Sequence, residues 1–251
     1  MKKLFPTMLD RPEGRTLISG IPYWAFAFFL FPFMIALFSQ DSGQVLYGAW
    51  LDMGYHLINF IVVIICFLPY LRESFLNVQL YLKKIFKTVA LGVVVVVAIK
   101  ILMCILFVSS SNELFANAAF GHLLTTESDL AYFSTALIEA QPLWGTLCVV
   151  LLTPVVTSCL LYACTFAPIC NNRPWLAYII MTGAFLLIQL IKIFSLWSGD
   201  EQLAGFWVQI PIHLLVCWTY QYTDTIWTPI AIHSISNLLL SLGTVLMVGI
   251  I

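Results

Sequence analysis

The chain has 251 residues, of which 61% are hydrophobic and only 9% are charged. Because an ordinary soluble domain carries about 25% charged residues, this composition excludes a water-facing surface over most of the protein. The formal net charge of −1 offers no basic footprint for nucleic acid, and no polar stretch is long enough to fold separately. The composition therefore predicts one integral membrane domain in contact with the lipid bilayer.

Charge-poor apolar runs of about 20 residues, the length that crosses ~30 Å of hydrocarbon, recur along the chain. Each is predicted to be an α-helix, because a backbone in lipid must satisfy its own hydrogen bonds. The predicted spans are residues 21–39, 55–71, 89–109, 143–169, 175–197, 206–222 and 229–250. The predicted fold class is therefore all-α, a polytopic membrane bundle of about seven transmembrane helices, with a tilt or break of the fourth span at Pro154 as an open alternative.

An amphipathic stretch, residues 73–88, precedes the third span and carries Lys83, Lys84 and Lys87. A basic amphipathic helix favours the membrane surface, so we expect this stretch to lie at the interface. The chain then divides into an N-terminal three-span region with an interfacial helix, residues 1–141, and a C-terminal core, residues 142–251.

Lysine and arginine are distributed asymmetrically about the predicted spans. Of the 11 Lys and Arg residues, all but Lys100 and Lys192 lie outside the spans, and with the N-terminus inside they all fall in cytoplasmic segments. The opposite loops contain acidic residues and no Lys or Arg. Because positive charge concentrates on the cytoplasmic side, the sequence predicts a multi-pass protein of the cell membrane with a cytoplasmic N-terminus.

Two ionisable side chains lie within predicted spans of the N-terminal region. Lys100 is near the middle of the third span, where a charge is costly, and we expect it to face the bundle or a wet cavity. His56 is near the start of the second span and is expected at the membrane interface rather than at a metal.

The last span contains "TPIAIHSISN", residues 228–237, in which His233 and Asn237 are four residues apart. Side chains at this spacing share one face of a helix. They can bond a neighbouring helix, line a wet cavity, or ligate one metal ion. The spacing alone leaves these alternatives open.

The surrounding run "DTIWTPIAIHSISNLLLSL" resembles the last motif helix of the CAAX-protease and bacteriocin-processing (CPBP) family. That family includes type II CAAX prenyl proteases and lysostaphin-resistance-protein-like proteins. Upstream, "LLTPVVTSCLLYA" and "TGAFLLIQL" resemble its first two motifs, and the resemblance covers about residues 142–240. The family's fixed positions in these runs are occupied here by Trp227, Pro229, His233, Asn237 and Pro154.

The resemblance implies a membrane metallopeptidase core, but the catalytic positions depart from the motifs. Where the family has E-E-x-x-x-R, this chain has Thr157, Ser158 and Tyr162, and F-x-x-x-H reads from Phe185 to Gln189. A hydrolytic metal centre needs about three protein ligands and a general base. Hydroxyl groups cannot serve as that base unaided, and no acidic residue between Glu139 and Asp200 restores the motif in another register. We therefore interpret the peptidase centre as degenerate.

Two functional hypotheses follow. The first is a non-catalytic binding or regulatory protein, or one of bacteriocin-immunity type, which needs no cofactor and binds another membrane protein or peptide. In that case His233 and Asn237 are remnants of a metal site. The alternative is an active intramembrane metalloendopeptidase whose divergent zinc site is built from His213, His233 and Asn237.

Overall fold

The computed structural model describes residues 12, 20, 23, 26–27, 45–108, 142–196 and 199–248. Every regular element in these residues is helical, as the composition and the apolar runs predict. The long helical stretches are α3 (Val45–Leu80), α4 (Leu82–Val108), a continuous helix over residues 142–172, α10 (Pro174–Leu196), α11 (Gly199–Thr223) and α12 (Trp227–Val248). We call the continuous stretch over residues 142–172 the central helix.

Three stretches are long and apolar enough to cross a membrane, among residues whose side chains the structure describes. They are Met53–Leu80, Leu82–Met103 and Leu143–Asn172, and a shorter apolar stretch, Pro174–Leu187, opens α10. The chain is therefore a helical membrane protein, while the count of about seven spans stays a prediction. The first predicted span, residues 21–39, lies outside the described residues apart from isolated positions.

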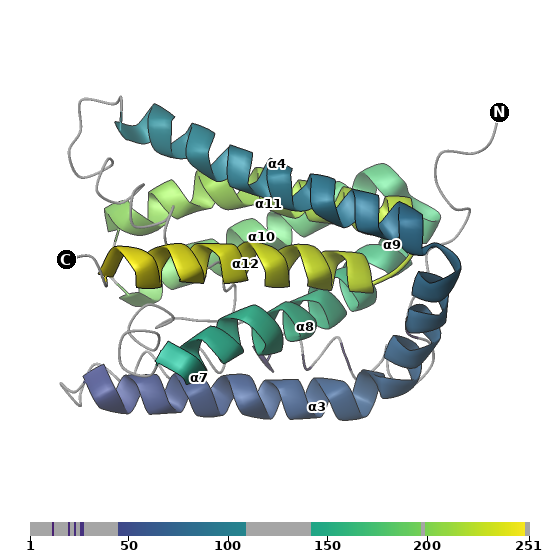
Figure 1. Cartoon of the computed structure of the whole chain (residues 1–251), viewed down its shortest axis with the longest axis horizontal. Helices are drawn as coiled ribbons and strands as arrows, with labels where there is room; N and C mark the ends of the chain where they lie inside the picture. The colour runs from purple at the N-terminus through teal and green to yellow at the C-terminus, as the bar shows by residue number, and fades with distance from the viewer. Residues whose placement is uncertain are drawn as a thin grey trace.

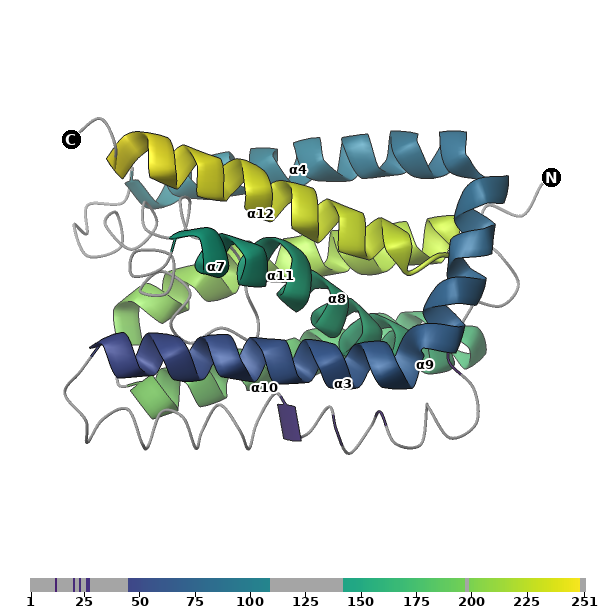
Figure 2. The same ribbon diagram turned by 60° about the horizontal axis from the view of Figure 1, so that its bottom comes forward.

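The central helix lies between α3 on one side and α11 and α12 on the other (Figures 1 and 2). It passes through α7 (Pro142–Leu147), η2 (Cys148–Leu152), α8 (Thr153–Thr157), η3 (Ser158–Phe166) and α9 (Ala167–Asn172). Every residue from 152 to 164 is buried. The central helix thus has no lipid-facing side over these residues.

The central helix does not break at Pro154. Instead, η2 and η3 are π-helical: the Thr153 N–H donates to the Cys148 carbonyl and the Ala167 N–H donates to the Tyr162 carbonyl, each five residues back. A proline follows directly after each of these donors, at Pro154 and Pro168. Because proline lacks an N–H and its ring clashes with the carbonyl four residues earlier, a locally widened turn accommodates each proline within one helix.

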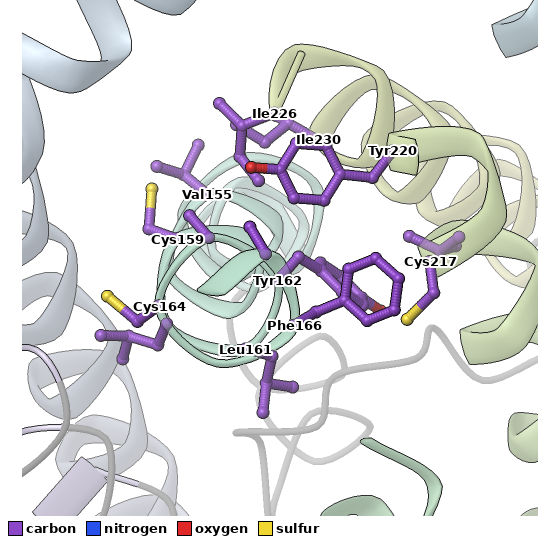
Figure 3. Close-up of a cluster of buried hydrophobic side chains, with 14 of the residues drawn as sticks. Val155, Cys159, Leu161, Tyr162, Cys164, Phe166, Cys217, Tyr220, Ile226 and Ile230 are labelled. Atoms are coloured by element: carbon purple, nitrogen blue, oxygen red, sulfur yellow. The ribbon is translucent and has the colours of Figure 1, made fainter. Parts of the chain in front are cut away.

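Aromatic and sulfur-containing side chains fill the core around the central helix. Figure 3 shows Tyr162 and Phe166 pointing toward Cys217 and Tyr220 of α11, with Cys159 and Cys164 on the opposite side of the helix. All six side chains are buried. This face of the central helix therefore packs against α11.

The C-terminal part of α3 changes direction beyond Pro69, a proline inside the helix. Figures 1 and 2 show this part crossing one end of the bundle before α4 runs back along it. Residues 73–80 thus lie across the bundle end, in the position expected of an interfacial helix. Residues 82–88 instead form the first turns of α4, where Ile85 and Thr88 are buried against the bundle.

Candidate functional site

Three rings from three helices meet in the core: Tyr162 of η3, His213 of α11 and His233 of α12. Their centroids are 6.1 Å apart for Tyr162–His213, 6.0 Å for Tyr162–His233 and 5.9 Å for His213–His233. All three side chains are buried. The structure therefore brings together three of the positions that the motifs single out.

Tyr162 and His213 are joined directly. The Tyr162 Oη and the His213 Nδ1 form a hydrogen bond of 2.5 Å. The ring of Phe185, on α10, lies 4.0 Å from the His213 ring between centroids. The residue at the arginine position of the first motif and the phenylalanine of the second thus both contact His213.

Asn237 contacts the central helix from α12. Its Nδ2 donates a hydrogen bond of 3.0 Å to the backbone carbonyl of Val149. In the π-helical pattern of η2, that carbonyl faces residue 154, which is a proline and has no N–H to donate. Asn237 therefore satisfies a carbonyl that the proline leaves without its backbone donor.

Thr157 and Ser158 occupy the two glutamate positions and are 1% and 0% exposed. Their hydroxyl groups, like that of Ser236 on α12, have no hydrogen-bond partner among the described residues. Buried polar atoms of this kind ordinarily bond water or another polar group. Gln189 lies in α10, and its side chain is outside the described residues.

The comparison with known families bears on these positions. Residues 139–239 match the family model "Type II CAAX prenyl endopeptidase Rce1-like". This part of the chain is an Rce1-like domain of the CPBP class. The resemblance drawn from the motifs is thereby confirmed. No curated protein and no solved structure matches the chain.

Within the described residues, the side chains of this Rce1-like domain do not form a complete zinc centre. Protein zinc sites use three or four nitrogen, sulfur or oxygen ligands. Among the described residues, no group of three or more His, Cys, Asp and Glu lies close enough together to hold an ion. His213 Nδ1 already bonds Tyr162, and the Asn237 amide bonds Val149. Both bonds orient residues of the set that the alternative hypothesis requires, and neither uses the His213 Nε2 or the Asn237 Oδ1 that a zinc ion would bind.

A second buried histidine contact lies outside the motifs of the Rce1-like domain. His56 of α3 is 1% exposed, and its Nδ1 is 3.2 Å from the Thr153 hydroxyl of the central helix. His56 lies near the start of the apolar stretch Met53–Leu80, and its expected place at the membrane interface stays a prediction. Thr153 precedes Pro154 in the sequence, and its hydroxyl needs a hydrogen-bond partner in a buried helix. That need was the sequence signal for the contact with His56.

Lys100 lies in the bundle interior and is 2% exposed. Of the two environments expected from the sequence, burial in the bundle agrees with the structure. The side chain of Lys192 is outside the described residues.

Proposed function

We propose that the Rce1-like domain of this protein is a non-catalytic module that binds another membrane protein or a membrane-active peptide. The observation that carries the proposal is the set of contacts made by Tyr162 and Asn237. Both residues occupy motif positions, and both hold helices together. Tyr162 bonds His213, and Asn237 bonds the Val149 carbonyl. Neither Tyr162 nor Asn237 is a base for activating water, and the two glutamate positions hold the hydroxyl groups of Thr157 and Ser158.

The narrower form of this proposal is bacteriocin immunity. The family that the motifs resemble works in CAAX processing and in bacteriocin production or self-immunity. A neutral, buried centre suits a protein that captures a bacteriocin peptide, or protects its membrane target, without cleaving it. Expression in a sensitive strain should then raise the concentration of bacteriocin needed for killing, and His233→Ala should preserve part of that protection.

The second candidate is a divergent metalloendopeptidase, which one observation favours. His213 and His233 approach each other on facing helices, with centroids 5.9 Å apart. His213 Nε2, His233 and Asn237 Oδ1 would be the ligands of one ion, with the bonds to Tyr162 and Val149 orienting two of them. This candidate still needs a general base, which the hydroxyl groups at the glutamate positions do not supply.

Metal analysis and a peptide-cleavage assay on the purified full chain separate the two candidates. The proposal predicts no stoichiometric zinc, no cleavage of prenylated CAAX peptides, and a modest loss of stability in His233→Ala. Interhelical polar contacts in membranes contribute about 0.6 kcal/mol on average and up to about 1.7 kcal/mol. Zinc at one equivalent that disappears in His233→Ala, with cleavage abolished by a chelator, would establish the peptidase instead.

A further inference from the structure

The end of the bundle at which α3 turns into α4 has an inner and an outer side with different chemistry. We call residues 70–87 the elbow segment. Its inner side is bonded to the turn between α11 and α12: Tyr70 Oη is 2.9 Å from Tyr220 Oη, and the Ser74 hydroxyl is 3.0 Å from that of Thr225. The elbow segment is therefore a fixed part of the fold.

The same turn is held at a further point. The indole Nε1 of Trp227 donates to the Leu71 carbonyl over 3.1 Å, and the Phe75 ring packs edge-on against the indole with centroids 5.6 Å apart. Trp227 begins α12, the helix that carries His233 and Asn237. The elbow segment thus positions the start of the helix on which the candidate site depends.

The outer side of the elbow segment combines exposed apolar and basic side chains. Its exposed large apolar residues are Phe75, Leu76, Leu80, Tyr81, Leu82 and Phe86, with Leu80 74% and Phe86 73% exposed. Its exposed charged residues are Arg72, Lys83, Lys87 and Glu73. Three positive charges against one negative leave this surface basic.

Lys84 is not part of that outer surface. Its Nζ donates to the Tyr222 carbonyl over 2.6 Å and lies 4.2 Å from the centroid of the Tyr222 ring. Lys84 is thereby committed to α11, whereas Arg72, Lys83 and Lys87 are exposed. The elbow segment thus contains exposed lysines and one lysine bonded within the protein, so that substitutions of the two kinds can be compared.

We propose that the outer side of the elbow segment is a docking surface for the headgroups of anionic lipids. The first part of the elbow segment crosses the end of the bundle (Figures 1 and 2), and we place it in the plane of the membrane interface. There, apolar side chains enter the acyl boundary while basic ones meet the headgroups. Anionic lipids attract such basic side chains, each worth about a fivefold change in binding. The turn between α9 and α10, which contains the exposed Arg173, lies at the same end of the bundle.

The test measures lipid retention by the full chain. Wild-type protein is purified in detergent and titrated with phosphatidylglycerol or with phosphatidylcholine, and bound lipid is counted by native mass spectrometry. We expect phosphatidylglycerol to be retained in preference to phosphatidylcholine. The combined variant Arg72→Gln, Lys83→Gln, Lys87→Gln should lower that preference by more than about tenfold, and added salt should weaken it in the wild type.

Two matched variants keep the result interpretable. Glu73→Gln, in the same exposed segment, should preserve or increase the preference, because it removes the opposing charge. Lys84→Gln should lower thermal stability while leaving lipid preference within about twofold, because Lys84 contacts Tyr222 rather than lipid. If the combined variant fails to fold, Lys83→Gln alone provides the same comparison with an expected fivefold loss of preference.

Three outcomes would overturn the proposal. One is equal retention of the two lipids by the wild type, and another is an unchanged preference in the combined variant. The third is complete displacement of phosphatidylglycerol by inorganic phosphate in solution, which would reveal a simple anion site. Self-association that depends on Phe86, together with equal retention of both lipids, would identify the surface as an interface between copies of the chain.

Discussion

Asn237 donates its side-chain amide to the backbone carbonyl of Val149 across 3.0 Å, and so joins α12 to the π-helical part of the central helix. The contact relates two motif residues, Asn237 and Pro154, through the carbonyl of Val149. Pro154 removes a backbone donor, and Asn237 supplies one in its place. The structural role that we propose for Asn237 therefore rests on a defined bond.

Removing the Asn237 amide should destabilise the protein, because the Val149 carbonyl is then buried without its side-chain donor. We expect Asn237→Ala to cost about 1–3 kcal/mol in the free energy of unfolding. In the background of Pro154→Ala, whose N–H restores a backbone donor, the same change should cost clearly less. A double-mutant cycle by reversible denaturant unfolding in micelles measures this coupling.

Asn172 provides the matched control for this cycle. Its Nδ2 also donates to a backbone carbonyl, that of Pro168 at 3.2 Å, but the contact is exposed. Asn172→Ala should therefore change stability by no more than about 0.5 kcal/mol. A cost at Asn172 equal to that at Asn237, or a cycle with no coupling to Pro154, would contradict the assigned role.

Tyr162→Phe tests the contact between the first motif and α11. The change removes the hydroxyl that bonds His213 Nδ1 at 2.5 Å and leaves the ring in place. We expect a loss of about 1–3 kcal/mol, because a buried imidazole nitrogen loses its partner. Adding His213→Phe should recover part of that loss. Tyr178→Phe, which removes a half-buried hydroxyl bond to Gln221, should cost about 1 kcal/mol and show no coupling to His213→Phe.

Restoring two motif residues tests whether neutral side chains are what distinguishes this centre from a metal site. Thr157→Glu combined with Gln189→His brings back a carboxylate and an imidazole at two motif positions. We expect this double variant to gain zinc binding, seen as a rise in melting temperature on adding zinc that is lost in His233→Ala. An equal zinc response in the unmodified chain would show that its own residues already form the site.

Gly92→Ala probes the packing of α4 against α12 next to His233. A Cβ at position 92 would lie 2.5 Å from Cδ1 and 3.0 Å from Cγ1 of Ile232. Because Ile232 is fully buried, we expect a net destabilisation of about 1 kcal/mol. Ile232→Val removes the nearer carbon and should relieve the clash.

Gly183→Ala, with nothing within 4 Å of the added carbon, should be neutral or stabilising by up to about 1 kcal/mol. Equal costs at the two glycines would contradict this account.

Several features followed from the sequence for clear physical reasons. Apolar runs with few charges predicted an all-helical membrane protein, because lipid demands internal backbone bonding. The alternative metal site grouped His213 with His233, and their ring centroids are 5.9 Å apart, while a metal at that point stays a prediction. The basic segment after residue 72 was expected at an interface, and its first part crosses the end of the bundle.

Other features left no readable signal in the sequence. Charge-poor runs mark the hydrocarbon region rather than contacts between helices, so the burial of His56 against Thr153 was not predicted. The π-helical stretches were also missed. Hydrophobic periodicity distinguishes helix types only when one face is polar, and residues 152–164 are buried on every side.

The burial of every residue from 152 to 164 in the central helix bears on how such a protein evolves. A single change that returns a carboxylate to position 157 places an ionised group at a site 1% exposed, at a cost of several kcal/mol. No ligand at position 189 would yet be present to hold the ion that offsets this cost. Loss of catalysis can therefore proceed through individually tolerated substitutions, whereas its recovery requires simultaneous ones. A lineage that acquires this neutral centre is held there by selection for stability alone.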